Sequence, residues 1–468
     1  MNANRSQTPG LAPAHDVVEQ ALGLATGEGC AVIVEESSEA EVRFANNTTT
    51  TNGVRRGRTV TVVSFRQVAG GIAAGVARRS GAVDVAELVR AAERDADDSP
   101  PAQDAAPLVE GSANSDFGEA PPGTDLSVFG DVLGGLAGAF DRARRAERVL
   151  AGFAEHTIGT TYLGTSTGLR RRHSQPTGAL HLVGRSTDQV RSAWTGVGTA
   201  DFAAVTLEAL EDRLVERLAW AERQIPLEPG RYEVVLPKEA VADLMVALVE
   251  AASGQDAQDG RSVFSAPGGT TRIGDVLSAL PFDLRSDPAE PCLECSPFLL
   301  AAASGADISV FDNGLALPPT DWIKQGRLHR LRYHRAGAQR SGAAATPPID
   351  NLVLELPGAA GTVEDLVART ERGLLLTCLW YIREVDPATL LLTGLTRDGV
   401  YLIEDGVVTG AVNNFRFNES PVDLLARATE AGKTDRALGR EFGEWLNRSA
   451  MPPLRIPDFN MSSVSPAS

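Results

Sequence analysis

The sequence predicts an α+β fold in two parts, an N-terminal sheet-plus-helices domain followed by a strand-rich C-terminal domain. Three observations carry this prediction. Residues 155–198 combine strand-like alternation with turns, and they lie between two segments of helical periodicity, residues 128–150 and 202–223. Residues 231–254 open with a β-branched strand that runs directly into a helical pattern. In residues 352–468, short apolar runs alternate with turn residues, which is typical of a strand-rich domain.

The N-terminal domain is expected to span residues 15–225, after a disordered tail of residues 1–14. Residues 46–53, NNTTTTNG, predict a turn-rich link, because Asn and Gly favour turn conformations. The link leads into residues 59–65, TVTVVSF, whose β-branched side chains predict a strand. Together with the helical segments, these strands predict a sheet with helices packed on it.

The C-terminal domain is expected to span residues 226–468 and to start with a strand at residues 232–236. Pro237 suits the first position of the following helix, because an N–H group there would have no partner. Apolar residues then recur at three- and four-residue steps and predict one buried stripe, formed by Val241, Leu244, Met245, Leu248, Val249 and Ala252. Gly254 is the expected stop of the helix. Residues 320–326 are expected to add a short helical piece.

The charge balance argues against nucleic acid and anionic membrane as partners. The 468 residues include 44 basic and 61 acidic side chains, which gives a net charge of −17. A chain this acidic repels phosphate groups through bulk electrostatics.

The overall composition is that of a globular protein. Hydrophobic and charged contents of 43% and 22% are ordinary for a globular protein with an ample core. Only Lys238, Lys324 and Lys433 are lysines, and the other basic residues are arginines.

Nothing in the sequence predicts secretion or membrane insertion. No segment approaches the roughly 20 apolar residues that a membrane-spanning helix needs. Residues 1–16 are polar and lack the apolar core of a signal peptide. Four cysteines in a chain of this length do not form a disulfide framework. The expected location is therefore the cytoplasm.

The helix after Pro237 opens with the sequence Lys-Glu-Ala-Val-Ala-Asp, residues 238–243. Set beside the metallopeptidase pattern His-Glu-x-x-x-His, it keeps the glutamate and has Lys238 and Asp243 in place of the two histidines. Through this segment, and through the order and spacing of several others, the chain resembles the TldD/PmbA family (modulator of DNA gyrase, or TldD–TldE metalloprotease). The other segments that carry the resemblance are residues 46–53, 161–168, 196–202, 253–264, 311–314, 401–406 and 451–459.

What the resemblance implies is a protein that works as one half of a pair. The TldD-type subunit carries His-Glu-x-x-x-His and a downstream cysteine as zinc ligands. The PmbA-type subunit, also called TldE, carries neither, and the chain is similar to this type. The resemblance therefore implies an α+β fold of the TldD/PmbA type, no cofactor in this chain, and zinc in a TldD-like partner subunit.

The residue chemistry points the same way. Zinc hydrolysis needs neutral imidazole or thiolate ligands, an open coordination position, and a carboxylate that moves the proton of the water. Lys238 cannot ligate in its charged form, and Asp243 is one hard ligand without companions. Glu239 would lie in the first helical turn, where a carboxylate favours the free N–H groups and the positive helix end. We interpret Lys238, Glu239 and Asp243 as a vestigial motif, and we expect no catalytic and no metal-binding residue. Cys378 lies in an apolar run and is expected to be a buried, inert thiol.

A second pattern of metal-binding residue types follows later in the chain. Cys292 and Cys295 form a Cys-x-x-Cys pair, and His329 and His334 follow in a basic segment. These four residues could close a structural zinc site, but the gap between the two pairs is far longer than a zinc-finger loop. A redox pair and two unpaired thiols are the other interpretations.

The function that the resemblance implies is that of a non-catalytic subunit in a two-component zinc metalloprotease. Such a chain would shape a chamber and hold unfolded or precursor peptides, which the partner's zinc site would cut. Two alternatives stay open, an independent homo-oligomeric peptide-binding protein and an enzyme repurposed for peptide modification. Against the second alternative stands the lack of any convergent set of His, Cys and Asp residues in the sequence.

Overall fold

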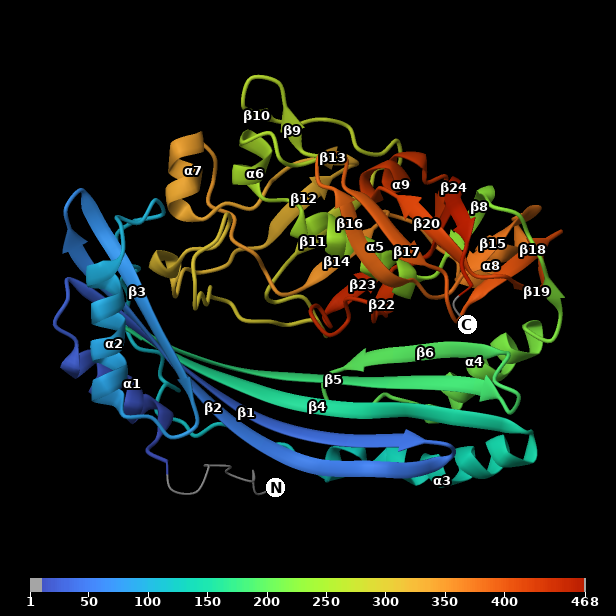
Figure 1. Ribbon diagram of the computed structural model, residues 1–468, viewed down its shortest axis with the longest axis horizontal. Coiled ribbons are helices and arrows are strands. Elements are labelled where there is room, and N and C mark those ends of the chain that lie inside the picture. The colour runs from blue at the N-terminus through green and yellow to red at the C-terminus, as the bar shows by residue number, and fades with distance from the viewer. Residues whose placement is uncertain (1–10, 467–468) are drawn as a thin grey trace.

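One six-stranded antiparallel sheet organises the N-terminal part. In this computed structural model, which describes residues 11–466, the strand order is β3-β2-β1-β4-β5-β6. Residues 1–10 of the expected tail lie outside the described residues. The strands are β1 (Gly29–Ala45), β2 (Thr48–Val68), β3 (Gly71–Ser80), β4 (Arg148–Thr165), β5 (Arg170–Ser186) and β6 (Ser192–Thr199). Figure 1 shows these long strands bending together into a trough.

Helices cover one face of this sheet. They are α1 (Ala14–Leu24), α2 (Val85–Asp98), α3 (Gly130–Arg145), preceded by the 3₁₀ turn η1 (Leu126–Phe129), and α4 (Leu207–Trp220). The alternation of side chains along β1 separates the two faces. Val32 and Val34 pack with α1 and α2, whereas Ala31 and Ile33 pack against residues 298–311 of the C-terminal part. Figure 1 shows α1 and α2 at one end of the trough and α3 and α4 at the other.

Two larger sheets and one small one make up the C-terminal part. The order in the six-stranded sheet is β13-β12-β11-β14-β23-β22. Its strands are β11 (Asp283–Ser286), β12 (Thr320–Lys324), β13 (Arg327–Leu328), β14 (Leu352–Glu355), β22 (Asp435–Ala437) and β23 (Ser449–Met451). A separate two-stranded sheet pairs β9 (Ser265–Ala266) with β10 (Thr270–Thr271).

The ten-stranded sheet has the order β16-β17-β20-β24-β8-β15-β18-β19-β7, with β21 beside β24. Its strands are β7 (Gln224–Ile225), β8 (Gly230–Leu236), β15 (Arg372–Leu376), β16 (Trp380–Asp386), β17 (Leu391–Leu395), β18 (Val400–Glu404), β19 (Val407–Val412), β20 (Phe415–Glu419), β21 (Glu430–Ala431) and β24 (Leu454–Val464). The helices of this part are α5 (Lys238–Glu250), α6 (Gly254–Gln258), α7 (Arg335–Ser341), α8 (Val363–Ala368) and α9 (Pro421–Arg427), with a 3₁₀ turn η2 (Val310–Asp312).

Helix α5 lies inside the largest hydrophobic core. This core joins side chains of α5, such as Leu244 and Leu248, to Leu354 of the six-stranded sheet and to Phe417 and Phe459 of the ten-stranded sheet. The residues of the expected stripe are buried or, in the case of Val249, half-buried. Burial extends beyond the stripe, because every residue from Glu239 to Val246 is buried. A helix enclosed between two sheets buries more than one face.

Three local expectations are wrong. Residues 320–326 form the strand β12 and a tight turn instead of a helical piece. Gly254 does not stop α5, which ends at Glu250, and instead begins α6. In residues 46–53, only Asn46 and Asn47 form the turn, with φ values of 52° and 58°, and β2 already starts at Thr48. Asn tolerates this left-handed backbone better than most residues.

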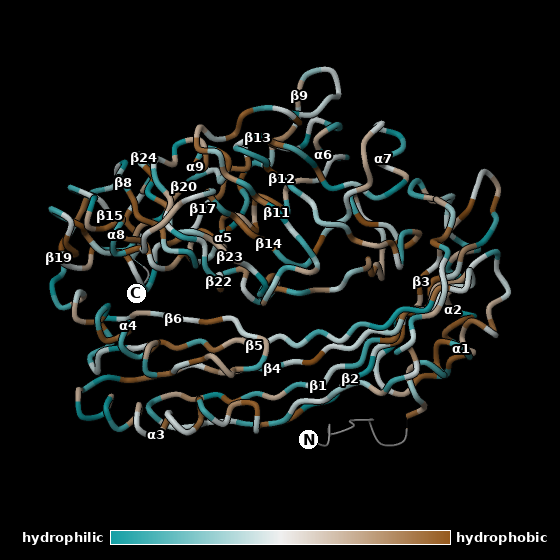
Figure 2. The backbone as a smooth tube through the Cα atoms, turned by 180° about the vertical axis from the view of Figure 1, so that it is seen from behind, coloured by the Kyte–Doolittle hydropathy of each residue, from teal (hydrophilic) through white to brown (hydrophobic). Residues whose placement is uncertain are grey.

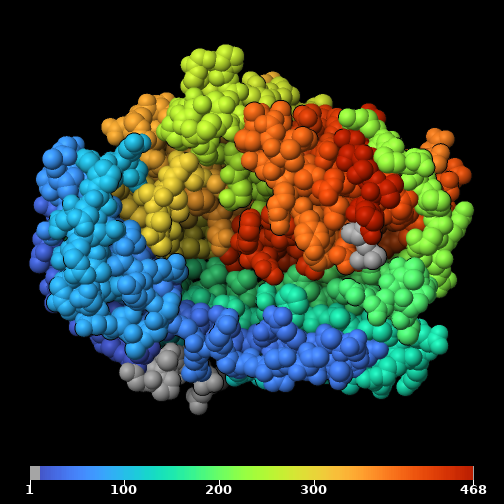
Figure 3. Space-filling model, in the orientation of Figure 1, coloured from blue at the N-terminus to red at the C-terminus, as the bar shows by residue number. Residues whose placement is uncertain are grey.

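The C-terminal part sits on the open face of the trough (Figure 1). Figure 2 shows the same arrangement from behind, with hydrophobic stretches in α1 and among the strands around α5. In the space-filling view of Figure 3, the C-terminal part overlies the blue and green strands of the N-terminal sheet. None of the helices in the described part of the chain has the length and hydropathy to span a bilayer.

Candidate functional site

The candidate site lies where α5 begins. Strand β8 runs between β24 and β15 in the middle of the ten-stranded sheet and delivers the chain to the helix. Pro237 is the N-cap, with φ −61° and ψ 162°, so it precedes the first helical residue by one position. Lys238, Glu239 and Asp243 consequently lie in the first two turns of α5, where residues 239–246 are all buried.

Lys238 is engaged in an ion pair. Its Nζ atom donates to Oδ2 of Asp435, which lies in β22. Lysine in its ammonium form has no lone pair to offer a metal ion. The first position of the motif therefore ties α5 to the neighbouring sheet.

Asp243 is engaged by backbone donors. Its side chain has no exposed surface. The backbone N–H of Arg440 donates to Oδ2 at 2.9 Å, and those of Glu441 and Phe442 donate to Oδ1 at 3.1 and 2.9 Å. Burial raises the pKa of Asp243 to about 7, although these three N–H groups act in the opposite direction. The carboxylate therefore fixes the loop at residues 440–442.

Glu239 differs from its two neighbours in the motif. Only 8% of the residue is exposed, yet no residue of the described chain forms a hydrogen bond or an ion pair with its side chain. It lies on the lining of a cavity of about 710 Å³. Of the three motif residues, Glu239 is thus the one whose side chain is left for an external partner.

The cavity draws its walls from both parts of the chain. Helix α4 of the N-terminal part contributes Trp220, Arg213, Glu216 and Arg217. The C-terminal part contributes Pro237, Thr377, Val363, Val367, Val408, Pro453 and the charged residues Lys238, Glu364, Lys433 and Asp435. Eight of the twenty lining residues are charged, four of each sign, and the others are apolar or uncharged. A concave site of this volume that combines apolar surface with placed charged groups is typical of a small-molecule or peptide site.

The comparisons with known proteins agree with this fold. The family model of the PmbA/TldA metallopeptidase C-terminal domain matches residues 229–463, about half of the chain and all of the strand-rich part up to β24. The chain belongs to the PmbA/TldD family. No curated protein matches.

Three solved structures share the fold over almost the whole chain. TldE from Thermococcus kodakarensis has a TM-score of 0.75 at 17% identity and covers 96% of this chain and 99% of its own. A candidate modulator of a DNA gyrase from Thermotoga maritima has a TM-score of 0.73 at 15% identity, covering 95% and 99%. A similar candidate modulator from Bacteroides thetaiotaomicron has a TM-score of 0.70 at 14% identity, covering 96% and 98%. At these identities the likeness establishes the α+β fold of the family.

The donor set at the start of α5 does not fit a zinc ion. A zinc ligand needs a free lone pair directed at the metal. The Lys238 ammonium has none. Asp243 has no exposed surface, and its carboxylate is directed at the three backbone N–H groups of residues 440–442. Within residues 11–466, no group of three or more His, Cys, Asp and Glu side chains could hold a metal ion. That this chain carries no metal and no catalytic residue stays a prediction.

The structure does not gather the Cys-x-x-Cys pair and the two histidines into such a group. Cys292 is exposed and Cys295 is buried, and burial raises the pKa of Cys295 to about 11. His334 is buried and caps α7, since its Nδ1 accepts the N–H of Gly337 at 3.1 Å, whereas His329 is exposed. A protonated thiol is a poor nucleophile and a poor ligand.

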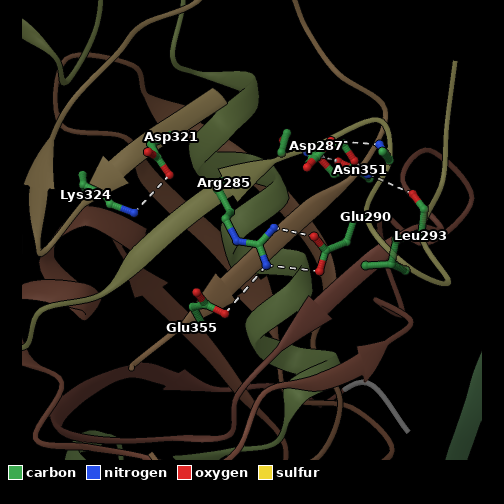
Figure 4. A network of polar contacts seen from close by, with 10 residues as sticks. Arg285, Asp287, Glu290, Leu293, Asp321, Lys324, Asn351 and Glu355 are labelled. Carbon is green, nitrogen blue, oxygen red and sulfur yellow. Dashed lines mark hydrogen bonds and ion pairs between the residues drawn. The ribbon is translucent and has the colours of Figure 1, made fainter. Parts of the chain in front are cut away.

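The loop that carries the two cysteines is held by other groups. Asn351 donates from Nδ2 to the carbonyl oxygens of Asp287 and Leu293, at 2.6 and 2.8 Å. Arg285 binds both carboxylate oxygens of Glu290 (Figure 4). These side-chain contacts hold the loop, and the cysteines add backbone hydrogen bonds: the N–H of Cys295 donates to the carbonyl of Pro288 at 3.1 Å, and the carbonyl of Cys292 accepts from Arg436 at 3.0 Å.

Cys378 lies between β15 and β16, outside a strand, and is buried as expected. Burial raises its pKa well above the usual value. Sequence reasoning missed the cavity itself, whose walls are distant in the sequence. One signal could have found part of it, because two of the three lysines, Lys238 and Lys433, line this one cavity.

Proposed function

We propose that this chain is the non-catalytic, TldE-like subunit of a two-component zinc metallopeptidase in the cytoplasm. A TldD-like partner with an intact His-Glu-x-x-x-His motif carries the zinc. The two subunits enclose a chamber in which an unfolded or precursor peptide is held and cut. This chain shapes the chamber and holds the peptide.

The observation that supports this proposal most is that Lys238 and Asp243 of the motif on α5 are already bound by other groups of this chain. Lys238 and Asp243 stand at the positions of the two histidines, and both are engaged by groups of the chain itself. A subunit with this arrangement contributes through its surfaces and its cavity. The hydrolytic chemistry then requires a second protein.

Co-expression tests the proposal. The partner is a relative from the same genome that carries His-Glu-x-x-x-His, and the readouts are size-exclusion chromatography and thermal unfolding. We expect co-elution in one complex, because an obligate interface buries more than about 2,000 Å². We also expect a higher melting temperature for this chain, since a partner that binds only the folded state stabilises it.

Two results would contradict the proposal. Separate elution at micromolar concentration with an unchanged melting temperature favours an independent homo-oligomeric peptide-binding protein. Chemical modification of a peptide by the chain alone favours the repurposed enzyme. An unrelated acidic protein of similar size serves as the control for non-specific association.

A further inference from the structure

We propose that the cavity at the start of α5 binds the cationic group of a peptide, with Glu239 as its counter-charge. The cation is an N-terminal ammonium group or the side chain of a lysine or arginine. The proposal rests on the proposed function only in taking the ligand to be a peptide.

The first support is the unmatched charge of Glu239. The residue is 8% exposed and lines the cavity, and no group in residues 11–466 forms a hydrogen bond or an ion pair with its side chain. The nearest cation in sequence, Lys238, is bound to Asp435. A recessed carboxylate without a partner costs free energy, and a cation that pairs with it offsets part of that cost. A ligand cation supplies the missing partner.

The second support is the distribution of charge around Glu239. The N-terminus of α5 carries about half a positive elementary charge, and Pro237 provides no side-chain cap. The carboxylate of Glu239 lies beside this helix end and is a counter-charge for a ligand cation. The rest of the lining carries both signs, with the acidic residues Glu216, Glu364 and Asp435 and the basic residues Arg213, Arg217, Lys238 and Lys433. This distribution suits a peptide whose cationic group enters first and whose carbonyl or carboxylate groups meet the basic residues.

The third support is the shape and polarity of the walls. Trp220, Val363, Val367 and Val408 line the cavity and offer apolar surface to an aliphatic stem. Trp220 is the aromatic residue of the lining, and the faces of aromatic rings attract ammonium and guanidinium groups. A volume of about 710 Å³ falls within the range of sites that enclose drug-sized ligands. A short peptide segment is of that size.

The test measures binding of short fluorescent peptides to the full-length chain alone, by fluorescence anisotropy. The first peptide has a free N-terminus and a norleucine side chain, the second has an acetylated N-terminus and a lysine, and the third has neither cation. We expect at least one cationic peptide to bind ten or more times more tightly than the third. The arm that gains affinity identifies the source of the cation.

Glu239→Gln is the decisive variant, and Glu364→Gln is its matched control, because Glu364 lines the same cavity but is exposed. We expect Glu239→Gln to weaken the cationic peptide about tenfold or more, since charge-assisted hydrogen bonds are the strong ones. The uncharged peptide should bind both proteins equally, and Glu364→Gln should change affinity less than about threefold.

Equal affinity of the three peptides for the unaltered chain would overturn the proposal, and so would full affinity of the cationic peptide for Glu239→Gln. The peptide series uses the unaltered chain and does not depend on the folding of any variant. Because the assay contains no partner, its failure is distinguishable from a failure of co-elution, which concerns the subunit assignment alone.

Discussion

Asp243 has no exposed surface and accepts three backbone N–H groups from residues 440–442. At the adjoining Gly439, an added Cβ atom would lie 2.4 Å from Oδ1 of Asp243. The loop and the carboxylate are thus fitted to each other closely. Asp243 stands at the position of the second histidine in the His-Glu-x-x-x-His pattern, and in this chain it holds the loop at residues 440–442 against α5.

Replacing Asp243 by Ala should lower the free energy of unfolding by about 3 kcal/mol, because three N–H groups lose their acceptor in a largely buried place. Chemical denaturation at neutral pH measures the loss. Asp423→Ala on α9 is the matched control, since that aspartate is exposed. A loss below about 0.5 kcal/mol, the range of ordinary surface changes, would contradict the structural role.

His181 gives the fold a pH dependence. It lies on β5 with its ring stacked on that of Phe153, and the two ring centroids are 4.6 Å apart. Burial lowers the pKa of His181 to about 3, and the positive charge of Arg440 lowers it further by a smaller amount. The unfolded chain binds a proton at this residue below about pH 6.5, and the folded chain does not. Holding His181 neutral therefore costs no unfolding free energy well above pH 6.5, and the cost grows as the pH falls from about 6.5 toward about 3.

Between about pH 6.5 and about pH 5, the native chain should lose about 2 kcal/mol more unfolding free energy than His181→Gln does. Denaturation curves at a series of pH values measure this difference. His329→Gln, at an exposed histidine, should follow the native chain. A curve for His181→Gln that runs parallel to the native one would show that the histidine is not held neutral.

At the scale of elements, the close packing of α2 on β3 depends on one glycine. A Cβ atom at Gly75 would lie 2.0 Å from the backbone N of Ala96 and 2.3 Å from the carbonyl O of Ala92. Both are backbone atoms of the helix, so a side chain cannot be accommodated by a rotamer change. The helix reaches the sheet only because residue 75 has no side chain.

Gly75→Ala should lower the free energy of unfolding by about 3 kcal/mol, at the upper end of the cost of overpacking. Gly53→Ala on β2 is the control, because no atom lies within 4 Å of its added Cβ. Thermal and urea unfolding compare the two variants. Equal stability of both would mean that α2 does not lie as close to β3 as the structure places it.

Elements with a strong local signal could be predicted from the sequence. The β-branched run before Pro237 and the regular apolar steps after it located β8 and α5. The hairpin of β12 and β13 was missed because its signal is weak. Its two-residue turn, Gln325 and Gly326, has positive φ at both positions, which hairpins usually meet with Asn-Gly or Asp-Gly. The glutamine at position 325 is not a typical residue for such a turn, so the sequence did not indicate a hairpin there.

At the scale of the whole molecule, the two parts are joined by an aromatic contact. The guanidinium of Arg440 lies 3.8 Å from the ring centroid of Trp380 and 5.5 Å from that of Trp194, which belongs to β6 of the N-terminal sheet. The loop that Asp243 holds thereby bridges the two parts. The cavity could not be predicted because it depends on this assembly. Trp220 of α4 and Glu239 of α5 meet there, and neither lies in a pattern that indicates the other.

The subunit assignment is tested most directly by a peptide-cleavage assay with the zinc-bearing partner, in the presence and absence of this chain. We expect cleavage of unfolded peptides only when both proteins are present, and no cleavage when both histidines of the partner's His-Glu-x-x-x-His motif are replaced by Ala. A partner that cleaves the same peptides equally fast without this chain would contradict the assignment.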